Sequence, residues 1–339
     1  MRLATRIGRL GMLAGGLGVG AALASSPGIA SADSSADPVS WVDELVAGLS
    51  LPAQTAAPVL DMQISISEID LFPTAGNTAT ATSGIGDIAI AIGNGSNASA
   101  NGGFLDFAFA DGTHSTASAG VLGSFDAAIA NGDNSNASAG VAGNFLLATA
   151  TGTNSTASAG VNSNFDIATA IGAGSKATVG VGGGLDAATA DGTGSSANAG
   201  LGQLDVATTV GNGSSTNAVG NLDLALVNGN TSDAAAQGGS FSAALANGGN
   251  IDATANGNLD FASVFNTGSG IDVAHAGGTS LNALGDYDIA MIIGTGSTAL
   301  AGADLTSPGY LDLAAVFGDL LDANATGGNF LLDILPLLF

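Results

Sequence analysis

Short stretches in which alternate side chains differ in polarity recur along most of the chain. In residues 125–130, Phe, Ala and Ile alternate with Asp, Ala and Ala, and a period of two residues is typical of a β-strand. Residues 131–134 (Asn-Gly-Asp-Asn) tolerate the positive φ angles of tight turns. Residues 135–141 form a second alternating stretch, and Gly143 opens the next turn. The pattern predicts pairs of short strands separated by turns.

This two-strand unit repeats about every 20 residues. The segments that start at residues 121, 141, 161 and 181 share one frame without insertion or deletion, and glycine recurs too often for helices to be stable. An apolar residue followed by Asp marks each repeat, with Leu146 in the Asp position of one repeat. The marker is seen at Leu105-Asp106, Phe125-Asp126, Phe165-Asp166, Leu185-Asp186, Leu204-Asp205, Leu222-Asp223 and Leu259-Asp260, and in altered form at Gly86-Asp87, Ile271-Asp272, Tyr287-Asp288 and Leu311-Asp312.

A fixed period with two strands per repeat predicts an all-β fold, an elongated parallel β-solenoid (β-roll or β-helix) of about 20-residue coils. Coils stacked about 4.8 Å apart would pair their backbones in parallel ladders, and about 12 coils would form a rod about 55–60 Å long. The space between two such sheets is narrow. We therefore expect Ala, Ser, Thr and Val to fill it, with one Phe, Leu or Ile per coil as a large anchor.

The flanks of the repeats differ from the repeats and predict caps. The sequence divides into residues 1–32, an N-terminal cap region 33–80, solenoid repeats 81–320 and an apolar C-terminal cap 321–339. In the first cap, Trp41, Leu45 and Leu49 fall on one face of a predicted short helix, and residues 62–66 alternate as a first strand. The apolar residues of 330–339 are expected to fold over the last coil.

The first 32 residues have the pattern of a secretory signal peptide. Three arginines lie within residues 1–9, an apolar run follows over residues 10–24, and Ala30-Ser31-Ala32 supplies a small-residue cleavage site before Asp33. The apolar run is shorter than the roughly 20 residues of a spanning helix. The sequence thus predicts a protein that is secreted or held at the cell surface or cell envelope.

The strong negative charge of the exported chain limits the classes of partner that it can bind. Beyond residue 32 it keeps one basic residue, Lys176, against 28 Asp and Glu, a difference of −27. Such a chain cannot neutralise phosphates, which excludes nucleic acid and anionic membranes as direct partners. Divalent cations, cationic proteins and neutral glycans remain open. The chain has no Cys, so packing and backbone pairing must provide its stability.

The aspartates of the repeat marker are the candidate metal ligands. In a solenoid they would lie in one column, where unit charges about 4.8 Å apart repel by about 1 kcal/mol even in water. The column would then have raised pKa values or recruit Ca²⁺. In the alternative, each Asp caps a strand end or turn by accepting hydrogen bonds from nearby amides. The residues of the calcium hypothesis are Asp126, Asp166, Asp186 and Asp205.

Catalytic chemistry has little support in this sequence. His114 and His275 each occupy an ordinary variant of the repeat, and a single turn histidine is more often a surface residue than a base. Serines are frequent, but none lies in a Gly-x-Ser-x-Gly elbow with partners. The glycine-rich turns do not precede a helix as a phosphate-binding loop would. We expect a protein that is not an enzyme and that needs no cofactor, calcium apart.

Two resemblances follow from these motifs. The signal segment with its Ala-Ser-Ala-Asp junction resembles those of mycobacterial exported proteins, and the Gly/Ala/Asn-rich repeats are similar in composition to the glycine-rich surface proteins of that group. Residues 87–100 (Asp-Ile-Ala-Ile-Ala-Ile-Gly-Asn-Gly-Ser-Asn-Ala-Ser-Ala) resemble the β-roll head repeats of trimeric autotransporter adhesins, although the heptad stalk of that family is missing. The resemblances imply a cell-envelope protein and adhesion.

The leading hypothesis is a structural or adhesive envelope protein whose regular faces contact an external surface, glycan or protein. The open ends of a solenoid also favour association with further copies of the chain. An alternative is an outer-envelope β-barrel pore, which the alternating segments and the terminal Phe339 favour, but 1 Trp and 2 Tyr supply no aromatic girdle. A third is binding to ice or crystal faces, based on Ser-Thr-Ala-Ser at residues 115–118 and 155–158.

Overall fold

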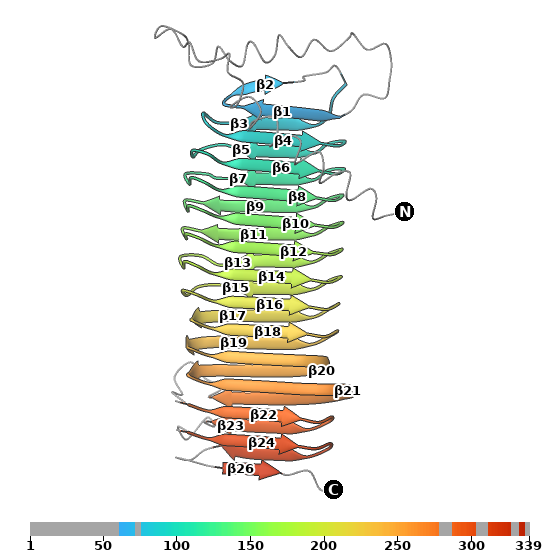
Figure 1. Ribbon diagram of the computed structural model, residues 1–339, viewed down its shortest axis with the longest axis vertical. Coiled ribbons are helices and arrows are strands. Elements are labelled where there is room, and N and C mark those ends of the chain that lie inside the picture. The colour runs from blue at the N-terminus through green and yellow to red at the C-terminus, as the bar shows by residue number, and fades with distance from the viewer. Residues whose placement is uncertain (1–60, 72–75, 278–286, 303–310, 327–331, 336–339) are drawn as a thin grey trace, which may run out of the picture. The chain divides into compact units, whose positions relative to one another are not determined.

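The computed structural model describes residues 61–71, 76–277, 287–302, 311–326 and 332–335, and the regular elements in these ranges are all β-strands. The chain divides into two compact units, and the described residues all belong to the second, Pro58–Phe339. The short helix predicted around residues 40–49 lies outside them. Figure 1 shows the strands stacked in two facing layers that are joined by turns on both sides.

The two layers are parallel ladders, and each circuit of the chain adds one strand to each. Partners lie in strict register one repeat apart, so that Ala128 pairs with Ala148 and Ala148 with Ala168. The first ladder consists of β4 (Ile88–Ile92), β6 (Phe107–Asp111), β8 (Ala127–Asn131), β10 (Leu147–Thr151), β12 (Ile167–Ile171), β14 (Ala187–Asp191), β16 (Val206–Val210), β18 (Leu224–Asn228), β22 (Ile289–Ile293), β24 (Leu313–Phe317) and β26 (Leu332–Leu335).

The second ladder consists of β3 (Thr80–Ser83), β5 (Asn97–Ala100), β7 (Thr116–Ala119), β9 (Asn136–Val141), β11 (Thr156–Val161), β13 (Lys176–Val179), β15 (Ser196–Ala199), β17 (Ser215–Asn221), β19 (Asp233–Ser240), β23 (Thr298–Gly302) and β25 (Asp322–Thr326). The long strands β20 (Ala243–Asn258) and β21 (Phe261–Gly277) run through both ladders. The protein is thus a parallel β-solenoid, which confirms the predicted fold class.

A β-hairpin closes one edge of the first ladder. Strand β1 (Met62–Ile66), which confirms the predicted first strand, pairs antiparallel with β4, and β2 (Ile69–Leu71) pairs antiparallel with β1. The two-residue turn between them has positive φ at both Ser67 and Glu68, as a tight hairpin turn requires. Because β1 covers the edge of β4, the backbone groups of that edge are paired, and a strand of another chain cannot pair with them.

Alanine fills the space between the ladders. In one coil, Ala128 and Ala130 of β8 face Ala137 and Ala139 of β9, and all four are fully buried. Each buried methyl group contributes only about 0.8 kcal/mol, so the solenoid is stabilised by many small contributions added along the stack, together with backbone pairing. The prediction of a narrow interior filled by small residues is confirmed.

Glycine is required where the turns of successive coils stack. Gly132 has a φ of 136°, and a Cβ at this position would lie 2.6 Å from the carbonyl oxygen of Gly152 in the next coil. The hydroxyl of Ser135 donates a hydrogen bond of 2.8 Å to the Gly132 carbonyl and so closes the turn. The sequence Gly-x-x-Ser therefore fixes this turn in repeat after repeat.

The large residue of the repeat marker lies outside the solenoid, not in its core, and this part of the prediction was wrong. Phe125, Phe145 and Phe165 are about half exposed, and their rings stack with centroids 4.9 Å apart. Each has a φ near +60°, which places the benzyl group on the outer side of the corner while the following residue turns inward. An interior lined by alanine has no room for a phenyl ring.

The ladders continue into the segment predicted as the C-terminal cap. Strand β25 pairs with β23, and β26 pairs with β24, in parallel register. The rest of residues 327–339 lies outside the described residues. The part of the chain that the structure describes contains no helix of the length and apolarity that a membrane-spanning helix needs.

Candidate functional site

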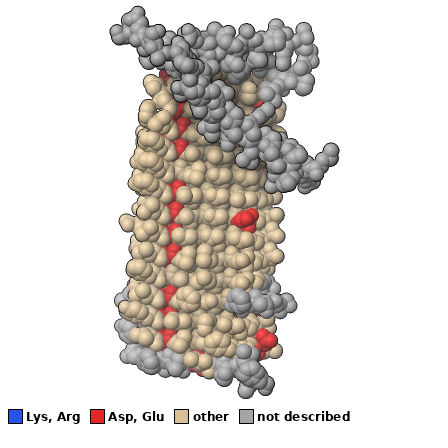
Figure 2. Space-filling view, in the orientation of Figure 1, with Lys and Arg blue, Asp and Glu red and all other residues tan. Residues whose placement is uncertain are grey.

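The aspartates of the repeat marker form a column inside the solenoid, where the chain enters the first ladder, except Asp272, which lies beside the second ladder and accepts a hydrogen bond from the backbone N–H of Ser297. The column is interrupted twice, by Leu146 and by Ser242, and Figure 2 shows a line of acidic residues, with gaps, along the stack. Its members are at most 1% exposed and comprise Asp87, Asp106, Asp126, Asp166, Asp186, Asp205, Asp223, Asp260, Asp288 and Asp312. The predicted ladder of aspartates with a break at Leu146 is confirmed.

From Asp87 to Asp288, one carboxylate oxygen of each aspartate in the column accepts a hydrogen bond from the next coil. Oδ1 of Asp87 accepts a hydrogen bond of 2.9 Å from the backbone N–H of Asp106, and Oδ1 of Asp106 accepts one of 3.0 Å from the N–H of Asp126. The same bond joins Asp186 to the N–H of Asp205 at 2.9 Å. Hydrogen bonds from amides are what the non-metal interpretation of the column predicted. The sequence predicted amides near the aspartate itself as donors, whereas the donor of each bond belongs to the next coil.

The second oxygen of several members is buried without a hydrogen-bond partner. This is true of Oδ2 in Asp87, Asp106, Asp126, Asp186 and Asp223. The atom lies against glycine backbone: a Cβ at Gly123 would lie 2.2 Å from Oδ2 of Asp126. In one coil a hydroxyl group lies close enough to donate to this oxygen: the hydroxyl of Ser163 donates a hydrogen bond to Oδ2 of Asp166.

Burial raises the pKa of several aspartates in the middle of the column. It raises the pKa of Asp126 and of Asp186 to about 6 and that of Asp223 to about 7, the charge of a neighbouring aspartate adds to the effect, and the amide hydrogen bond opposes it. The pKa of Asp106 and of Asp205 is also raised by burial. Near neutral pH the column therefore holds a mixture of carboxylic acids and carboxylates, which lessens repulsion along it.

The four aspartates of the calcium hypothesis are only partly brought together. Asp166, Asp186 and Asp205 occupy successive coils, but Leu146 separates Asp126 from Asp166. Among the described residues, no three acidic or histidine side chains gather as a metal site would require. Because each Oδ1 is occupied by an amide and the carboxyls are shielded from water, the geometry fits a structural ladder better. Calcium binding stays a prediction.

The outer surface of the first ladder is largely apolar, and we call it the apolar face. Every second residue of its strands points outward, and bulky aliphatic or aromatic side chains occupy many of these positions, with Thr, Ala, Asn, Ser and the aspartates Asp111 and Asp191 between them. These apolar residues are Ile88, Ile90, Ile92, Phe107, Phe109, Ile129, Leu147, Ile167, Ile171, Val206, Val210, Leu224, Leu226, Leu245, Phe261, Ile289, Met291, Ile293, Leu313 and Phe317.

The outer surface of the second ladder has the opposite character, and we call it the polar face. Within the first four residues of each strand from β5 to β17, the outward residues are Asn97, Ser99, Thr116, Ser118, Asn136, Ser138, Thr156, Ser158, Lys176, Thr178, Ser196, Asn198, Ser215 and Asn217. Neighbours of one kind bond along the stack, as the amide of Asn198 does to Oδ1 of Asn217 at 2.7 Å. The solenoid is therefore amphipathic across its thickness.

This contrast was missed in the sequence, although the signal was present. The alternation identified the strands, but the outward residues of the two strands in each repeat were not compared with one another. In the repeat 161–180, for example, Ile167 and Ile171 point outward from β12, whereas Lys176 and Thr178 point outward from β13. The comparison needs only the assumption that both strands share one interior.

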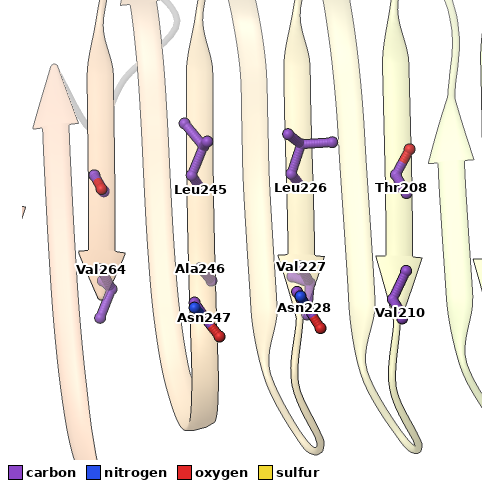
Figure 3. A pocket seen from close by; sticks show the side chains of 10 residues that line it. Thr208, Val210, Leu226, Val227, Asn228, Leu245, Ala246, Asn247 and Val264 are labelled. Carbon is purple, nitrogen blue, oxygen red and sulfur yellow. The ribbon is translucent and has the colours of Figure 1, made fainter. Parts of the chain in front are cut away.

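A shallow depression lies on the apolar face (Figure 3). It has a volume of about 400 Å³, and small Thr208 and Ser263 flank the longer Leu226 and Leu245 in it. Figure 3 shows Thr208, Leu226 and Leu245 in a row across neighbouring strands, with Val210 in the row beside it. Its lining contains no charged residue, so the depression suits an apolar side chain better than a charged ligand.

The remaining candidate groups are scattered. The imidazole of His114 lies in a turn against Gly95, and Lys176 lies on the polar face. His275 belongs to β21, and burial lowers its pKa while the nearby Asp252 opposes that shift. The structure does not bring the two histidines together, since they lie in widely separated coils.

Comparison with known proteins adds no relative: no family model, no curated protein and no solved structure matches the chain. The fold alone therefore defines the class, a parallel β-solenoid repeat protein with a buried aspartate column and two chemically different faces.

Proposed function

We propose that this chain is an exported structural or adhesive repeat protein of the cell envelope, without catalytic activity, which binds its partner along the polar face. The observation that carries the proposal is the regularity of that face. Ser, Thr and Asn side chains recur on it in register from β5 to β17, at the spacing of about 4.8 Å between neighbouring strands.

The chemistry of the polar face favours a neutral, hydroxyl-rich partner. Hydroxyl and amide groups both donate and accept hydrogen bonds, and many weak bonds repeated along a surface add up through multivalency. Lys176 is the one basic residue among the outward positions of β5–β17, so an anionic partner would find little to bind. A neutral polysaccharide or glycan is the partner class that this composition fits.

Export is supported by the arrangement of residues 1–32, which have the pattern of a signal peptide. The resemblances of that segment to mycobacterial exported proteins, and of the repeats to adhesin heads, agree with an envelope location. The Ser-Thr-Ala-Ser segments that led to the ice-binding alternative contribute Thr116, Ser118, Thr156 and Ser158 to the same face. A thermal-hysteresis measurement on the purified chain separates that alternative from glycan binding.

A co-sedimentation experiment tests the proposal. The purified chain is mixed with an insoluble neutral polysaccharide, cellulose, and with envelopes of the producing cell, and the unbound fraction is measured. The wild-type chain should be depleted by at least one of the two. Ser158→Glu with Thr178→Glu on the polar face should weaken depletion about tenfold or more, while the matched pair Thr149→Glu with Thr169→Glu on the apolar face should not. The proposal is contradicted if both double variants are depleted to the same extent, or if the wild-type chain is not depleted at all.

A further inference from the structure

We propose that the apolar face is an interface between two copies of this chain, which pack through it and leave both polar faces outward. This inference concerns a different surface from the one assigned to the envelope partner, and it does not rest on that assignment. It follows from the exposure, extent, charge and shape of the apolar face.

The apolar face exposes bulky apolar side chains on strands at both ends and in the middle of the stack. Ile88, Ile167, Ile171, Ile289 and Ile293 are each about 40% exposed, although they lie on well-paired strands. Soluble monomers rarely leave contiguous apolar patches of more than a few hundred Å² in water. Bulky apolar residues occupy outward positions on most strands from β4 to β24, with Thr, Ala, Asn and Asp between them.

The extent of the apolar face matches what a stable dimer buries. At about 4.8 Å per strand, the run from β4 to β24 measures about 50 Å, and five residues at about 3.3 Å give a width of about 16 Å. The product is about 800 Å² per copy, or about 1,600 Å² for a pair, which is the size of a standard specific interface.

Few charged residues lie on the apolar face. Among the outward residues of β4 to β24 that the structure describes, the charged ones are Asp111 and Asp191. Both are the last residue of their strand, where the rim of an interface is solvated. Most members of the aspartate column point into the solenoid, so the high negative charge of the chain does not concentrate at the proposed contact.

The shape of the face suits pairing with itself. The strands of the first ladder stay in parallel register without a shift from β4 to β18, and Figure 1 shows them running in nearly the same direction along the stack. Two such sheets can face each other about 10 Å apart, as in a β-sandwich. A two-fold axis places the same surface on both sides.

The centre of the face favours a protein partner over a lipid surface. Thr149, Thr169, Thr189 and Thr208 form the middle column of four successive strands. Their hydroxyls could bond to the corresponding threonines of a second copy, whereas in hydrocarbon they would lose their hydrogen bonds with water at a cost. A second copy is thus the occupant that satisfies both the apolar and the hydroxyl groups.

Sedimentation equilibrium of the full chain tests the inference. The wild type is expected to be a dimer at micromolar concentration. Thr169→Lys with Thr208→Lys on the apolar face should weaken dimerisation at least about 100-fold, because unpaired charges would be buried in the interface. The matched control, Thr178→Lys with Asn217→Lys, adds the same charge to the polar face of the same coils and should leave the dimer intact. Circular dichroism verifies that both variants fold.

Labelling shows where the contact lies. Because the chain has no Cys, single variants Thr189→Cys on the apolar face and Asn198→Cys on the polar face can each carry one spin label. Dipolar broadening between copies is expected for the first label and not for the second. The inference is overturned if the wild type is monomeric, if the polar-face pair dissociates it, or if dimers form only when residues 1–32 are present. If the chain is a monomer and binds phosphatidylcholine vesicles so that the spin label on the Thr189→Cys variant becomes immobilised, the apolar face binds a lipid surface instead.

Discussion

Oδ1 of Asp126 accepts a hydrogen bond of 2.9 Å from the backbone N–H of Leu146, which occupies the same place one coil further along. The aspartate thereby ties two coils together inside the solenoid, while its Oδ2 is buried without a hydrogen-bond partner. The carboxyl group in this position accepts a hydrogen bond from the next coil, whereas its buried charge destabilises the folded chain once the group ionises. The stability of the solenoid should therefore depend on the protonation of the column.

The first prediction concerns pH. The pKa of Asp126 and Asp186 in the folded chain is about 6 and that of Asp223 about 7, against an ordinary value of 3.8. Because the folded state binds these protons more tightly than the unfolded state, the free energy of unfolding should rise as the pH falls from about 8 to about 4. Urea denaturation at several pH values measures it, and a maximum at pH 8 would contradict the assignment.

Substitution of Asp126 separates its hydrogen bond from its charge. Asp126→Asn keeps an acceptor oxygen for the Leu146 amide and removes the charge, so the variant should be at least as stable as the wild type at pH 8. Asp126→Ala leaves that amide without its acceptor and should lower the free energy of unfolding by about 1–3 kcal/mol. Chemical denaturation of both variants gives the comparison. Equal destabilisation by Asn and Ala would mean that the hydrogen bond contributes little.

A polar pair in the core gives a third prediction. Thr209 of β16 and Thr216 of β17 face each other in the interior with their hydroxyl oxygens 2.7 Å apart, where the preceding coils have alanines. Thr209→Val keeps the shape of the side chain, but it removes the partner of the Thr216 hydroxyl and of the Ser196 carbonyl. It should cost about 1–3 kcal/mol. The double variant Thr209→Ala with Thr216→Ala, which restores the common coil, should be less destabilised than the single substitution if the unpaired hydroxyl is the cause.

The calcium hypothesis has its own signature. If Ca²⁺ binds at Asp166, Asp186 and Asp205, it must do so through ionised carboxylates. Millimolar calcium should then raise the thermal unfolding midpoint at pH 8 but not at pH 5, where protons compete. Asp186→Asn should abolish the shift, and magnesium serves as a control ion. The absence of any calcium-dependent shift at pH 8 would remove the hypothesis and leave the column a purely structural ladder.

Export predicts a defined N-terminus. Mass spectrometry of the protein recovered from the producing cells should find a chain that begins at Asp33, because Ala30 and Ala32 offer the small side chains that signal peptidase requires. Ala32→Phe should block this cleavage and leave the longer form, while the conservative Ala32→Ser should be processed. A chain that retains residues 1–32 in the wild type would argue against a cleaved signal.

How far the sequence predicts this protein can be followed in a single repeat. The 20-residue frame places Asp126, Leu146 and Asp166 at equivalent positions, and because parallel strands of a solenoid stack in register, the column and its break follow directly. The strands around residues 127–131 and 136–141 follow from their alternation, and the turns between them from Asn and Gly. Local chemistry and an exact period were sufficient for this much of the fold.

The marker pair Phe125-Asp126 shows what the sequence could not decide. The alternating pattern predicts that the two side chains lie on opposite sides of the sheet. Judged by hydrophobicity alone, the phenylalanine would be placed in the interior. Stacking settles the matter, because two sheets held apart by alanines leave a slot that admits a carboxyl group and excludes a ring, and the positive φ at Phe125 turns the ring outward. The chain by itself determined the period, the strands and the register. The tertiary structure alone decided which side faced in, since that depends on the distance between the two sheets.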